Sequence, residues 1–337
     1  MDNNIDHISK VAVLGSGSWA TALAKLLLKN CERIGWYFRS DDKIEEFKKY
    51  GHNPSYLTDV SFDTDRIDFS SDINEVASGA DTLVVAMPSP YFLPEISKLT
   101  IDIKSKNIVS AVKGIVPDRN MIITDYFEQV CGVPRGNMLV IGGPCHAEEV
   151  ALERLSYLTI GCLDTEKARQ FAARLASAKM KTIISDDVDG IEYAAVLKNV
   201  YAIAAGMVNG MKAGDNFMAM LVSNAIREMR KFVDTISPMP RDIDRSAYLG
   251  DLLVTAYSKF SRNHNFGSML GKGYSVKVAK MEMSMVAEGY YGTKCMYDIN
   301  ERPDLQVEMP ILDMVHAVLY EGVNVRRAMK ELADSFS

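Results

Sequence analysis

Near its N-terminus the chain reads VAVLGSGSWA from Val11 to Ala20 and continues as TALAKLLLK from Thr21 to Lys29. The apolar run predicts a buried strand, and the amphipathic stretch predicts a helix. Between them lies GxGxxA, whose first glycine permits a tight turn and whose second lets the backbone approach a pyrophosphate at the helix N-terminus. Ala20 replaces the third glycine, where helix and strand pack. The pattern predicts a dinucleotide-binding turn at Gly15 and Gly17; the alternative is a tight turn without a ligand.

Strand and helix patterns continue to alternate through the first half of the chain. Further short apolar runs lie at Arg33–Phe38, Thr82–Ala86, Ile108–Val112 and Met138–Ile141. Strands this apolar are usually covered on both faces, as in a parallel sheet with helices on either side. We therefore expect a Rossmann-like, doubly wound α/β domain in the N-terminal half.

The second half of the chain is helical in pattern from about Gly190 onward, including the stretches Lys277–Ile299 and Pro310–Ala333. The polar, turn-rich segment Ser185–Gly190 separates the two patterns. A chain of 337 residues also suits about two domains. We expect a dinucleotide-binding α/β domain at residues 1–189 and an all-α substrate-binding and catalytic domain at residues 190–337.

The composition excludes several classes of protein. Lys and Arg total 38 and Asp and Glu total 44, a net charge of −6, whereas nucleic-acid-binding proteins usually carry a basic excess. The five cysteines are widely spaced without a CxxC, so we expect neither a disulfide framework nor a metal site. Reduced thiols suit the cytoplasm. The polar N-terminus does not resemble a signal peptide, and no run of about 20 apolar residues predicts a membrane span.

Arg39 follows the second predicted strand, some 22 residues after Gly17. An acidic residue at this place binds the ribose 2′-hydroxyl of NAD, whereas an arginine nearby suits the 2′-phosphate of NADP. Arg39 therefore favours NADP(H), although Asp41 and Asp42 follow closely and leave NAD(H) open. The alternative is a solvated surface arginine.

Two lysines lie where lysines are unusual. Lys113 ends a predicted strand, and ligands of open α/β sheets bind beyond the carboxyl ends of the strands. It can face both a cofactor and an anionic substrate, or be an exposed loop lysine. Lys198 lies in YAAVLKNVYAIAAG, a helix apolar on all sides, where burial lowers the pKa of an amine and makes proton exchange feasible. The alternative is a lysine that snorkels to the helix edge.

Further polar groups follow in the helical half. Asp251, in LGDLLVT, can hold Lys198 or a substrate hydroxyl, or it can be a helix N-cap. Ser261, Arg262 and Asn263 combine a guanidinium with hydroxyl and amide donors, a set suited to a phosphate. The alternative for this triplet is a surface helix end.

Taken together, these motifs resemble the bacterial NAD(P)-dependent glycerol-3-phosphate dehydrogenase family over about residues 10–333. The segments that carry the resemblance, in order, are GSGSWATALA, SAVKGI, GGPCHAEE, EYAAVLKNVYAIAAG, LGDLLVTAYSKFSRNHNFG, MVAEGYYGTK and VEMPILDMVHAVLYEG. The resemblance implies reduction of dihydroxyacetone phosphate to sn-glycerol 3-phosphate with NAD(P)H, which supplies phospholipid synthesis. It also implies a homodimer, since members of the family are commonly dimeric.

The resemblance also implies a role for individual residues. Lys198 is then the general acid and base at the substrate C2 oxygen, and Lys113 contacts both substrate and cofactor. The other implied substrate-binding residues are Gly143, Cys145, Asp251, Ser261, Arg262 and Asn263. The other implied cofactor-binding residues are Ser18, Trp19, Ala147, Arg262, Val286 and Glu288.

The chain departs from the family pattern at Ala20, at Cys145, where Ser or Thr is usual, and at Tyr248, which begins YLGD in place of GLGD. Cys145 predicts a weaker or missing hydrogen bond to the substrate. Two other interpretations stay open. One is a related two-domain β-hydroxyacid or ketopantoate reductase with a carboxylate substrate. The other is a dinucleotide sensor without catalysis, which has no use for a buried lysine.

Overall fold

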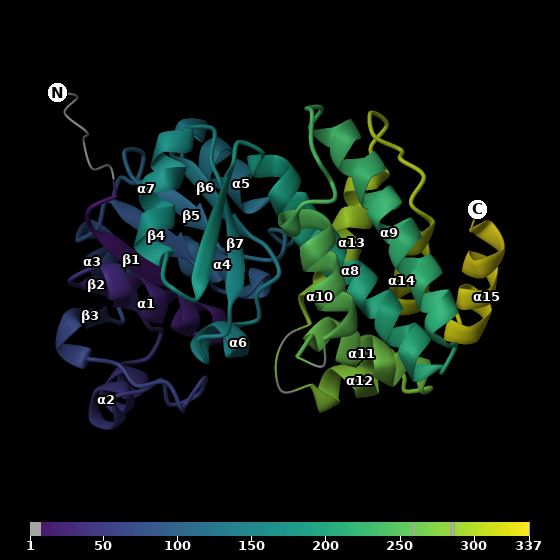
Figure 1. Ribbon diagram of the computed structural model, residues 1–337, viewed down its shortest axis with the longest axis horizontal. Coiled ribbons are helices and arrows are strands. Elements are labelled where there is room, and N and C mark those ends of the chain that lie inside the picture. Colours follow the sequence, from purple (N-terminus) through teal and green to yellow (C-terminus); the bar gives the residue numbers. More distant parts are fainter. Residues whose placement is uncertain (1–7, 259, 284, 286, 337) are drawn as a thin grey trace. The chain divides into compact units, whose positions relative to one another are not determined.

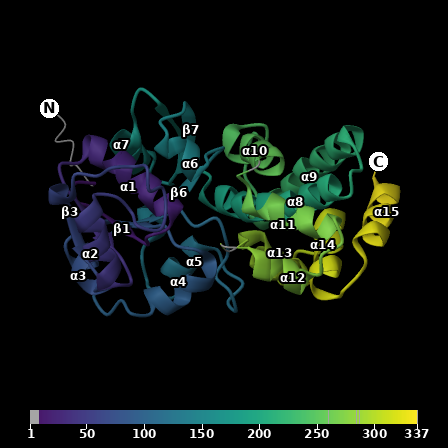
Figure 2. The same ribbon diagram turned by 90° about the horizontal axis from the view of Figure 1, so that it is seen from below.

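The computed structural model describes residues 8–258, 260–283, 285 and 287–336. These residues form two compact units, which Figures 1 and 2 show in two orientations. The first unit runs to Val112 and resumes at Ile123–Val188, and the second comprises Lys113–Ile122 and the chain from Asp189 onward. The short segment Lys113–Ile122 thus belongs with the helical half, whereas a single domain boundary at residue 189 would assign it to the first domain.

Within the described residues of the first unit, eight strands form one sheet in the order β3-β2-β1-β4-β5-β6-β7-β8. Neighbouring strands are parallel except for β6 and β7, which are antiparallel. The strands are β1 Val11–Leu14, β2 Ile34–Tyr37, β3 Ile67–Ser70, β4 Thr82–Val85, β5 Asn107–Ser110, β6 Met138–Gly142, β7 Ser156–Gly161 and β8 Met180–Ser185. The expected Rossmann-like doubly wound sheet is present, and one of its strand pairs, β6–β7, is antiparallel.

The apolar runs identified five of these strands to within two residues at each end. They missed β3, β7 and β8, which lie at or near the edges of the sheet. Most of β3 and β8 is exposed or half-buried, and β7 has an exposed tyrosine, Tyr157, among its buried residues, whereas β1, β4 and β5 are buried at every position. Edge strands lack the continuous apolar run by which a central strand is identified.

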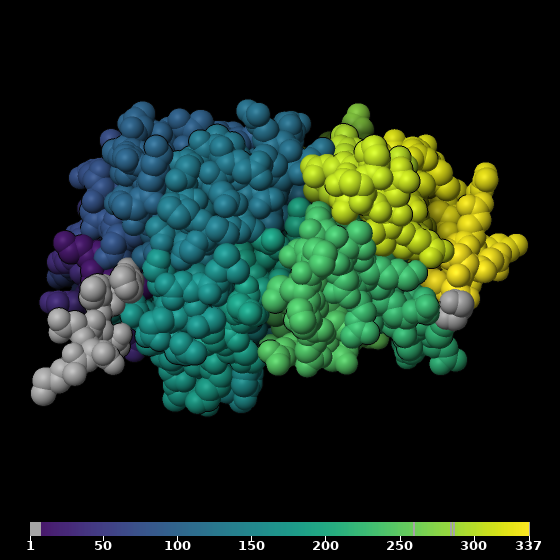
Figure 3. Space-filling view, turned by 90° about the horizontal axis from the view of Figure 1, so that it is seen from above, coloured from purple at the N-terminus to yellow at the C-terminus, as the bar shows by residue number. Residues whose placement is uncertain are grey.

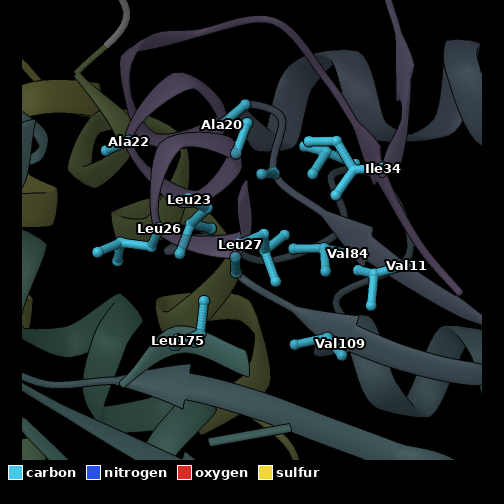
Figure 4. Packing of buried hydrophobic residues seen from close by; sticks show 14 of the residues in the cluster. Val11, Ala20, Ala22, Leu23, Leu26, Leu27, Ile34, Val84, Val109 and Leu175 are labelled. Carbon is cyan, nitrogen blue, oxygen red and sulfur yellow. The ribbon is translucent and has the colours of Figure 1, made fainter. Parts of the chain in front are cut away.

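Helices cover the sheet on both faces (Figure 2). Those of the first unit are α1 Ser18–Asn30, α2 Asp41–Tyr50, α3 Ile73–Ser78, α4 Ser89–Ile96, α5 Ile123–Gln129, α6 Ala147–Ala151 and α7 Thr165–Leu175, with short 3-10 turns at Thr64–Arg66 and Arg135–Asn137. Helix α1 lies over the middle of the sheet, and its Leu23 and Leu27 belong to the same buried cluster as Val84 and Val109 of the strands (Figure 4). This packing holds the N-terminus of α1 at the carboxyl end of β1.

The second unit is helical in all its described elements. They are α8 Val188–Gly210, α9 Asp215–Ile236, a π-helical turn Ser246–Gly250, α10 Asp251–Tyr257, α11 Arg262–Gly271, α12 Val276–Glu282, α13 Glu288–Asn300, α14 Pro310–Tyr320 and α15 Val325–Ser335. The stretch after Pro310 is two helices rather than one, because the chain turns at Gly322 with a φ of +75°. The charged residues of α15 are exposed. This helix belongs to the yellow, C-terminal part of the surface in Figure 3.

Helix α8 is the core of this unit. It has 23 residues and is long and apolar enough to cross a membrane by length and composition, yet its apolar stretch is entirely buried by the protein itself. Core helices that are hydrophobic all round behave in this way. Its burial explains why an apolar sequence surrounds Lys198.

Helices α8 and α11 cross in backbone contact. A Cβ added to Gly206 would lie 2.0 Å from the His264 carbonyl oxygen, and one added to Gly267 would lie 2.0 Å from the Ile203 carbonyl oxygen. The same closeness recurs one turn further along, between Gly210 and Gly271. Only glycine permits two helices to approach this closely, so the crossing sets the position of the α11 N-terminus relative to α8.

Candidate active site

The predicted dinucleotide turn has the geometry that its glycines suggest. Gly15 adopts a φ of +123°, and a Cβ at this position would lie 2.4 Å from the Ala86 carbonyl oxygen. Gly17 is the N-cap of α1 and offers no capping side chain, and the first turn of α1 contains no acidic residue. Ala20 is fully buried, as expected where the helix packs on the sheet. The turn therefore leaves the positive end of α1 open to an anion.

Arg39 lies just beyond β2 and is exposed. Its guanidinium lies over the ring of Tyr91 on α4, 4.8 Å from the ring centre, in a cation–π contact. Asp41 and Asp42 occupy the first turn of α2, where the helix dipole favours carboxylates. The two aspartates are therefore stabilised by the N-terminus of α2. Arg39 is the charged residue that lies nearest to the end of β2.

Gly143 and Cys145 lie in the loop between β6 and α6. Gly143 has a φ of +115°, and a Cβ there would lie 2.8 Å from the Tyr157 carbonyl oxygen. The Cys145 thiol donates a 3.2 Å hydrogen bond to that same carbonyl and is buried. Ala147 is the first residue of α6. The thiol is therefore engaged with the backbone of β7, and the substrate and cofactor contacts implied for these three residues stay predictions.

The second unit contains a buried ion pair between Lys198 on α8 and Asp251 on α10. The side chains are only 3% and 2% exposed, so Lys198 does not snorkel to the surface. Asp251 is the first residue of α10, whose N-cap is Gly250, so the N-cap alternative for Asp251 is wrong. Its Oδ1 contacts the Lys198 Nζ, and its Oδ2 is buried without a hydrogen-bond partner among the described residues. An acceptor oxygen is thus left for a hydroxyl group of a ligand.

Burial has a large effect on Lys198. It lowers the pKa of the ammonium from its usual range to about 7, against the opposing effect of the Asp251 carboxylate, and the nearby charge of Lys113 lowers it further. An amine with this pKa exchanges its proton near neutral pH. Strongly perturbed groups of this kind cluster at functional sites.

Lys113 lies beside this pair. Its carbonyl oxygen accepts a 2.7 Å hydrogen bond from the amide Nδ2 of Asn199, the residue that follows Lys198 on α8. Its side chain is half-buried rather than exposed. The segment Lys113–Ile122 is thus tied to the helical unit at the position of Lys198, and the alternative of an exposed loop lysine is wrong.

The triplet Ser261, Arg262 and Asn263 lies at the N-terminus of α11, with Ser261 as the N-cap. Ser261 caps this helix by accepting the His264 N–H at 3.2 Å, and the Asn263 carboxamide oxygen accepts the Gly289 N–H at 2.9 Å. A Cβ on Gly289 would lie 2.5 Å from the Asn199 carbonyl oxygen. The start of α13 therefore contacts both α8 and α11.

Ser261 and Asn263 are buried and Arg262 is half-buried, so the surface alternative for this triplet is wrong. Through Gly289, Asn263 lies near Asn199, the residue that follows Lys198. Glu288 begins α13 and is half-buried, whereas Val286 lies outside the described residues. In the described part of the chain, no group of three His, Cys, Asp or Glu side chains is placed to hold a metal ion.

Two family models match the chain in succession. The N-terminal part of NAD-dependent glycerol-3-phosphate dehydrogenase matches residues 10–168, and the C-terminal part matches residues 187–330. The NAD(P)+ glycerol-3-phosphate dehydrogenase of Limosilactobacillus reuteri is 31% identical over 331 residues, which cover 96% of this chain and 97% of the relative. The chain belongs to the NAD-dependent glycerol-3-phosphate dehydrogenase family. The enzyme of the same name from Bacillus subtilis is 32% identical over 96% of this chain and 94% of its own length.

Solved structures agree with this assignment. The glycerol-3-phosphate dehydrogenase of Coxiella burnetii superposes with a TM-score of 0.88 at 27% identity, covering 97% of this chain and 99% of that one. The family resemblance, the α/β-plus-helical fold class and the NAD(P)-dependent oxidoreductase class predicted from the sequence are confirmed.

Sequence reasoning missed several residues of this glycerol-3-phosphate dehydrogenase family member. The ring of Tyr91 on α4 lies under the Arg39 guanidinium, and Asn53 contacts the dinucleotide turn from a loop after α2. Gly289 joins Asn199 to Asn263. None of them lies near its partner in the sequence. Asn53 alone offered a signal, as a lone asparagine in the turn-rich GHNPS segment.

Proposed function

We infer that the chain reduces dihydroxyacetone phosphate to sn-glycerol 3-phosphate with NADPH or NADH, and that Lys198 supplies the proton. The observation that supports this role is the buried Lys198–Asp251 pair, in which a lysine has a pKa of about 7. A non-catalytic sensor has no need of such a group. Membership of the family also favours a phosphorylated substrate over the carboxylate substrates of related reductases.

Each residue of the pair has a distinct part in this reaction. A reduced nicotinamide, when bound, supplies the hydride. The Lys198 ammonium donates a hydrogen bond to the carbonyl oxygen at C2, stabilises the charge that develops there and transfers its proton to it. Asp251 holds Lys198 in place, and its second oxygen, Oδ2, accepts a substrate hydroxyl. In the oxidative direction neutral Lys198 takes the proton back.

The remaining predicted residues bind the substrate, including its phosphate group, and the dinucleotide cofactor. Arg262 holds the substrate phosphate, with Ser261 and Asn263 beside it, because a guanidinium forms paired hydrogen bonds with phosphate oxygens. Lys113 adds a second cation and Gly143 and Cys145 complete the substrate contacts. The cofactor is held by the open end of α1 and by further groups. These are Gly15, Gly17, Ser18, Trp19, Arg39, Lys113, Ala147, Arg262, Val286 and Glu288.

We assign the cofactor-binding role to residues 1–189 and the catalytic role to residues 190–337. We further propose that the protein is a cytoplasmic homodimer and that its product enters phospholipid synthesis.

The reaction is tested by absorbance of the reduced nicotinamide. Purified protein should oxidise NADPH or NADH when dihydroxyacetone phosphate is added, and unphosphorylated dihydroxyacetone should give little turnover because it lacks the group that Arg262 binds. Equal rates with both compounds would contradict the assigned phosphate site. Turnover with a 2-oxo or 3-hydroxy carboxylate instead would favour the related reductases.

Replacing Arg39 by aspartate should shift the cofactor preference toward NADH. The change removes a cation that suits the 2′-phosphate and introduces a carboxylate that suits the ribose hydroxyls. We expect the ratio of kcat/KM for NADPH to that for NADH to fall about tenfold or more, from the loss of a charge-assisted hydrogen bond. Arg169→Asp, an equal charge change at an exposed position of α7, is the control. An unchanged ratio in Arg39→Asp would make Arg39 a surface residue.

A further inference from the structure

The dinucleotide turn is held from inside the first unit. Each of its three consecutive carbonyl oxygens accepts a hydrogen bond from a different buried side chain. The bonds are Trp36 Nε1 to the Gly15 oxygen at 2.8 Å, Asn53 Nδ2 to the Ser16 oxygen at 3.0 Å, and Thr21 Oγ1 to the Gly17 oxygen at 2.9 Å. The three donors come from β2, the loop after α2, and α1. Trp36 and Thr21 are fully buried and Asn53 is 1% exposed.

Asn53 uses its whole hydrogen-bonding capacity in this arrangement. Its Nδ2 also donates to the Thr21 hydroxyl at 2.8 Å, so that Asn53 and Thr21 act on the turn as a linked pair. Its Oδ1 accepts the backbone N–H groups of Ser55 and Tyr56, at 2.9 and 3.2 Å. A carboxamide has two donor hydrogens and two acceptor lone pairs, and all four are in use. The orientation of Asn53 is therefore determined by its own loop as well as by the turn.

Together with the backbone hydrogen bond from the Thr21 N–H to the Gly17 oxygen at 2.9 Å, these bonds determine where the amides of the turn point. In a trans peptide the carbonyl oxygen and the N–H of the next residue lie on opposite sides of the chain. Carbonyl oxygens held inside the unit therefore direct the N–H groups of Ser16, Gly17 and Ser18 to the opposite side. Free amide donors at a helix N-terminus are the groups that bind phosphate oxygens. An unrestrained glycine turn could instead present its carbonyl oxygens to an anion, which would repel it.

We propose that Asn53 and Thr21 are positioning residues for cofactor binding, which hold the Ser16 and Gly17 carbonyl oxygens inward so that the turn presents only N–H donors to the pyrophosphate. This inference rests on the proposed function, since it requires a dinucleotide at the turn. Neither residue contacts the cofactor. Both act through the backbone conformation of Gly15–Gly17.

The test compares Thr21→Val, which removes the hydroxyl at nearly constant shape, with Thr21→Ser, which retains it. Asn53→Asp is the second variant, because it replaces the donor by an acceptor facing the Ser16 oxygen. Each of Thr21→Val and Asn53→Asp removes two buried hydrogen bonds. The dissociation constant of NADPH should rise about tenfold or more in both. Thr21→Ser should stay within about twofold of the unsubstituted protein. The KM for dihydroxyacetone phosphate at saturating NADPH should not change in any of them.

Inhibition by cofactor fragments locates the effect. ADP-ribose contains the pyrophosphate and should lose affinity in parallel with NADPH, whereas 2′-AMP lacks it and should keep its affinity. Asn74→Asp is the matched control, because the Asn74 amide also donates to a backbone carbonyl, that of Lys98 at 2.9 Å, and accepts a backbone N–H, that of Thr100 at 2.7 Å. It does so at the start of α3, in the same unit and away from the dinucleotide turn, so its cofactor affinity should not change.

The outcomes separate the two claims. If the unsubstituted protein does not bind NADPH, the proposed function fails. If it binds NADPH and folded Thr21→Val binds it as tightly as Thr21→Ser does, the positioning role is overturned. A fall in melting temperature with unchanged NADPH affinity of the folded protein also overturns it, because such a result describes a purely structural residue.

Discussion

Replacing Lys198 by arginine should lower kcat about a thousandfold, within the range by which general acid–base groups contribute to catalysis. Arginine keeps a positive charge beside Asp251, but its guanidinium does not release a proton at neutral pH. The dissociation constant of the cofactor should stay within a few fold, because Lys198 is not among the residues assigned to cofactor binding. A loss of turnover without a loss of binding is the result expected of a proton donor.

Arginine is the informative substitution because it preserves the buried pair. Lys198→Ala should also lose most turnover, but it leaves the Asp251 carboxylate buried and unpaired, which costs about 3–5 kcal/mol of stability. Melting temperatures of both variants separate the two effects. Lys277→Ala, at an exposed position of α12, is the control for loss of a positive charge. Normal turnover in folded Lys198→Arg would remove Lys198 from the mechanism.

The role of Lys198 predicts opposite pH dependences for the reduction of dihydroxyacetone phosphate and the oxidation of sn-glycerol 3-phosphate. Burial lowers the Lys198 pKa from its usual range to about 7. Reduction requires the protonated ammonium, so kcat/KM for dihydroxyacetone phosphate should fall as the pH rises through about 7. Oxidation of sn-glycerol 3-phosphate requires the neutral amine and should rise over the same range. A Lys198→Arg protein should lose this limb of both profiles.

Substituting Gly206 by alanine should destabilise the helical unit by about 3 kcal/mol or more, the upper range for an overpacked core. Helix propensity alone predicts the opposite sign, since alanine is favoured over glycine in a helix by about 1 kcal/mol. The contact decides between the two effects. A Cβ at Gly206 would lie 2.0 Å from the His264 carbonyl oxygen and 2.8 Å from the Ser268 nitrogen, and both are backbone atoms that cannot rotate away.

Thermal unfolding measures this effect, with an expected fall in melting temperature of about 10 °C. Gly136→Ala is the control, because nothing lies within 4 Å of the Cβ that it adds. Its stability should change by about 0.5 kcal/mol or less. A Gly206→Ala protein as stable as the unsubstituted chain would show that α8 and α11 can separate without cost. Their crossing would then not set the position of the α11 N-terminus.

The parts of the molecule that follow from local sequence were predictable. The strand, turn and helix around Gly15 are contiguous in the sequence, so the structural elements that flank the glycine motif can be read directly beside it. Lys198 was recognisable as buried because its whole helix is apolar. Asp251 was one candidate partner of Lys198, but its place in the sequence fits a helix N-cap equally well. The choice between these alternatives depends on how α8 and α10 pack, which the sequence does not state.

Features that depend on distant contacts could not be predicted. The antiparallel strand β7 and the edge strand β8 have no continuous apolar run. Asn53 reaches the turn across 37 residues of chain. The hydrogen bond between the Cys145 thiol and the Tyr157 carbonyl depends on the pairing of β6 with β7. In each case the missing information is which segments pack together.

The segment Lys113–Ile122 limits how the protein can be divided. A fragment that begins at Asp189 contains Lys198, Asp251 and Arg262. It lacks Lys113, whose carbonyl oxygen accepts the hydrogen bond from Asn199. A chimera joined at residue 188 would likewise combine Lys113 from one parent with Asn199 from the other. Exchange of the helical unit between relatives therefore requires three junctions, so that the inserted segment is inherited together with the helices around Lys198.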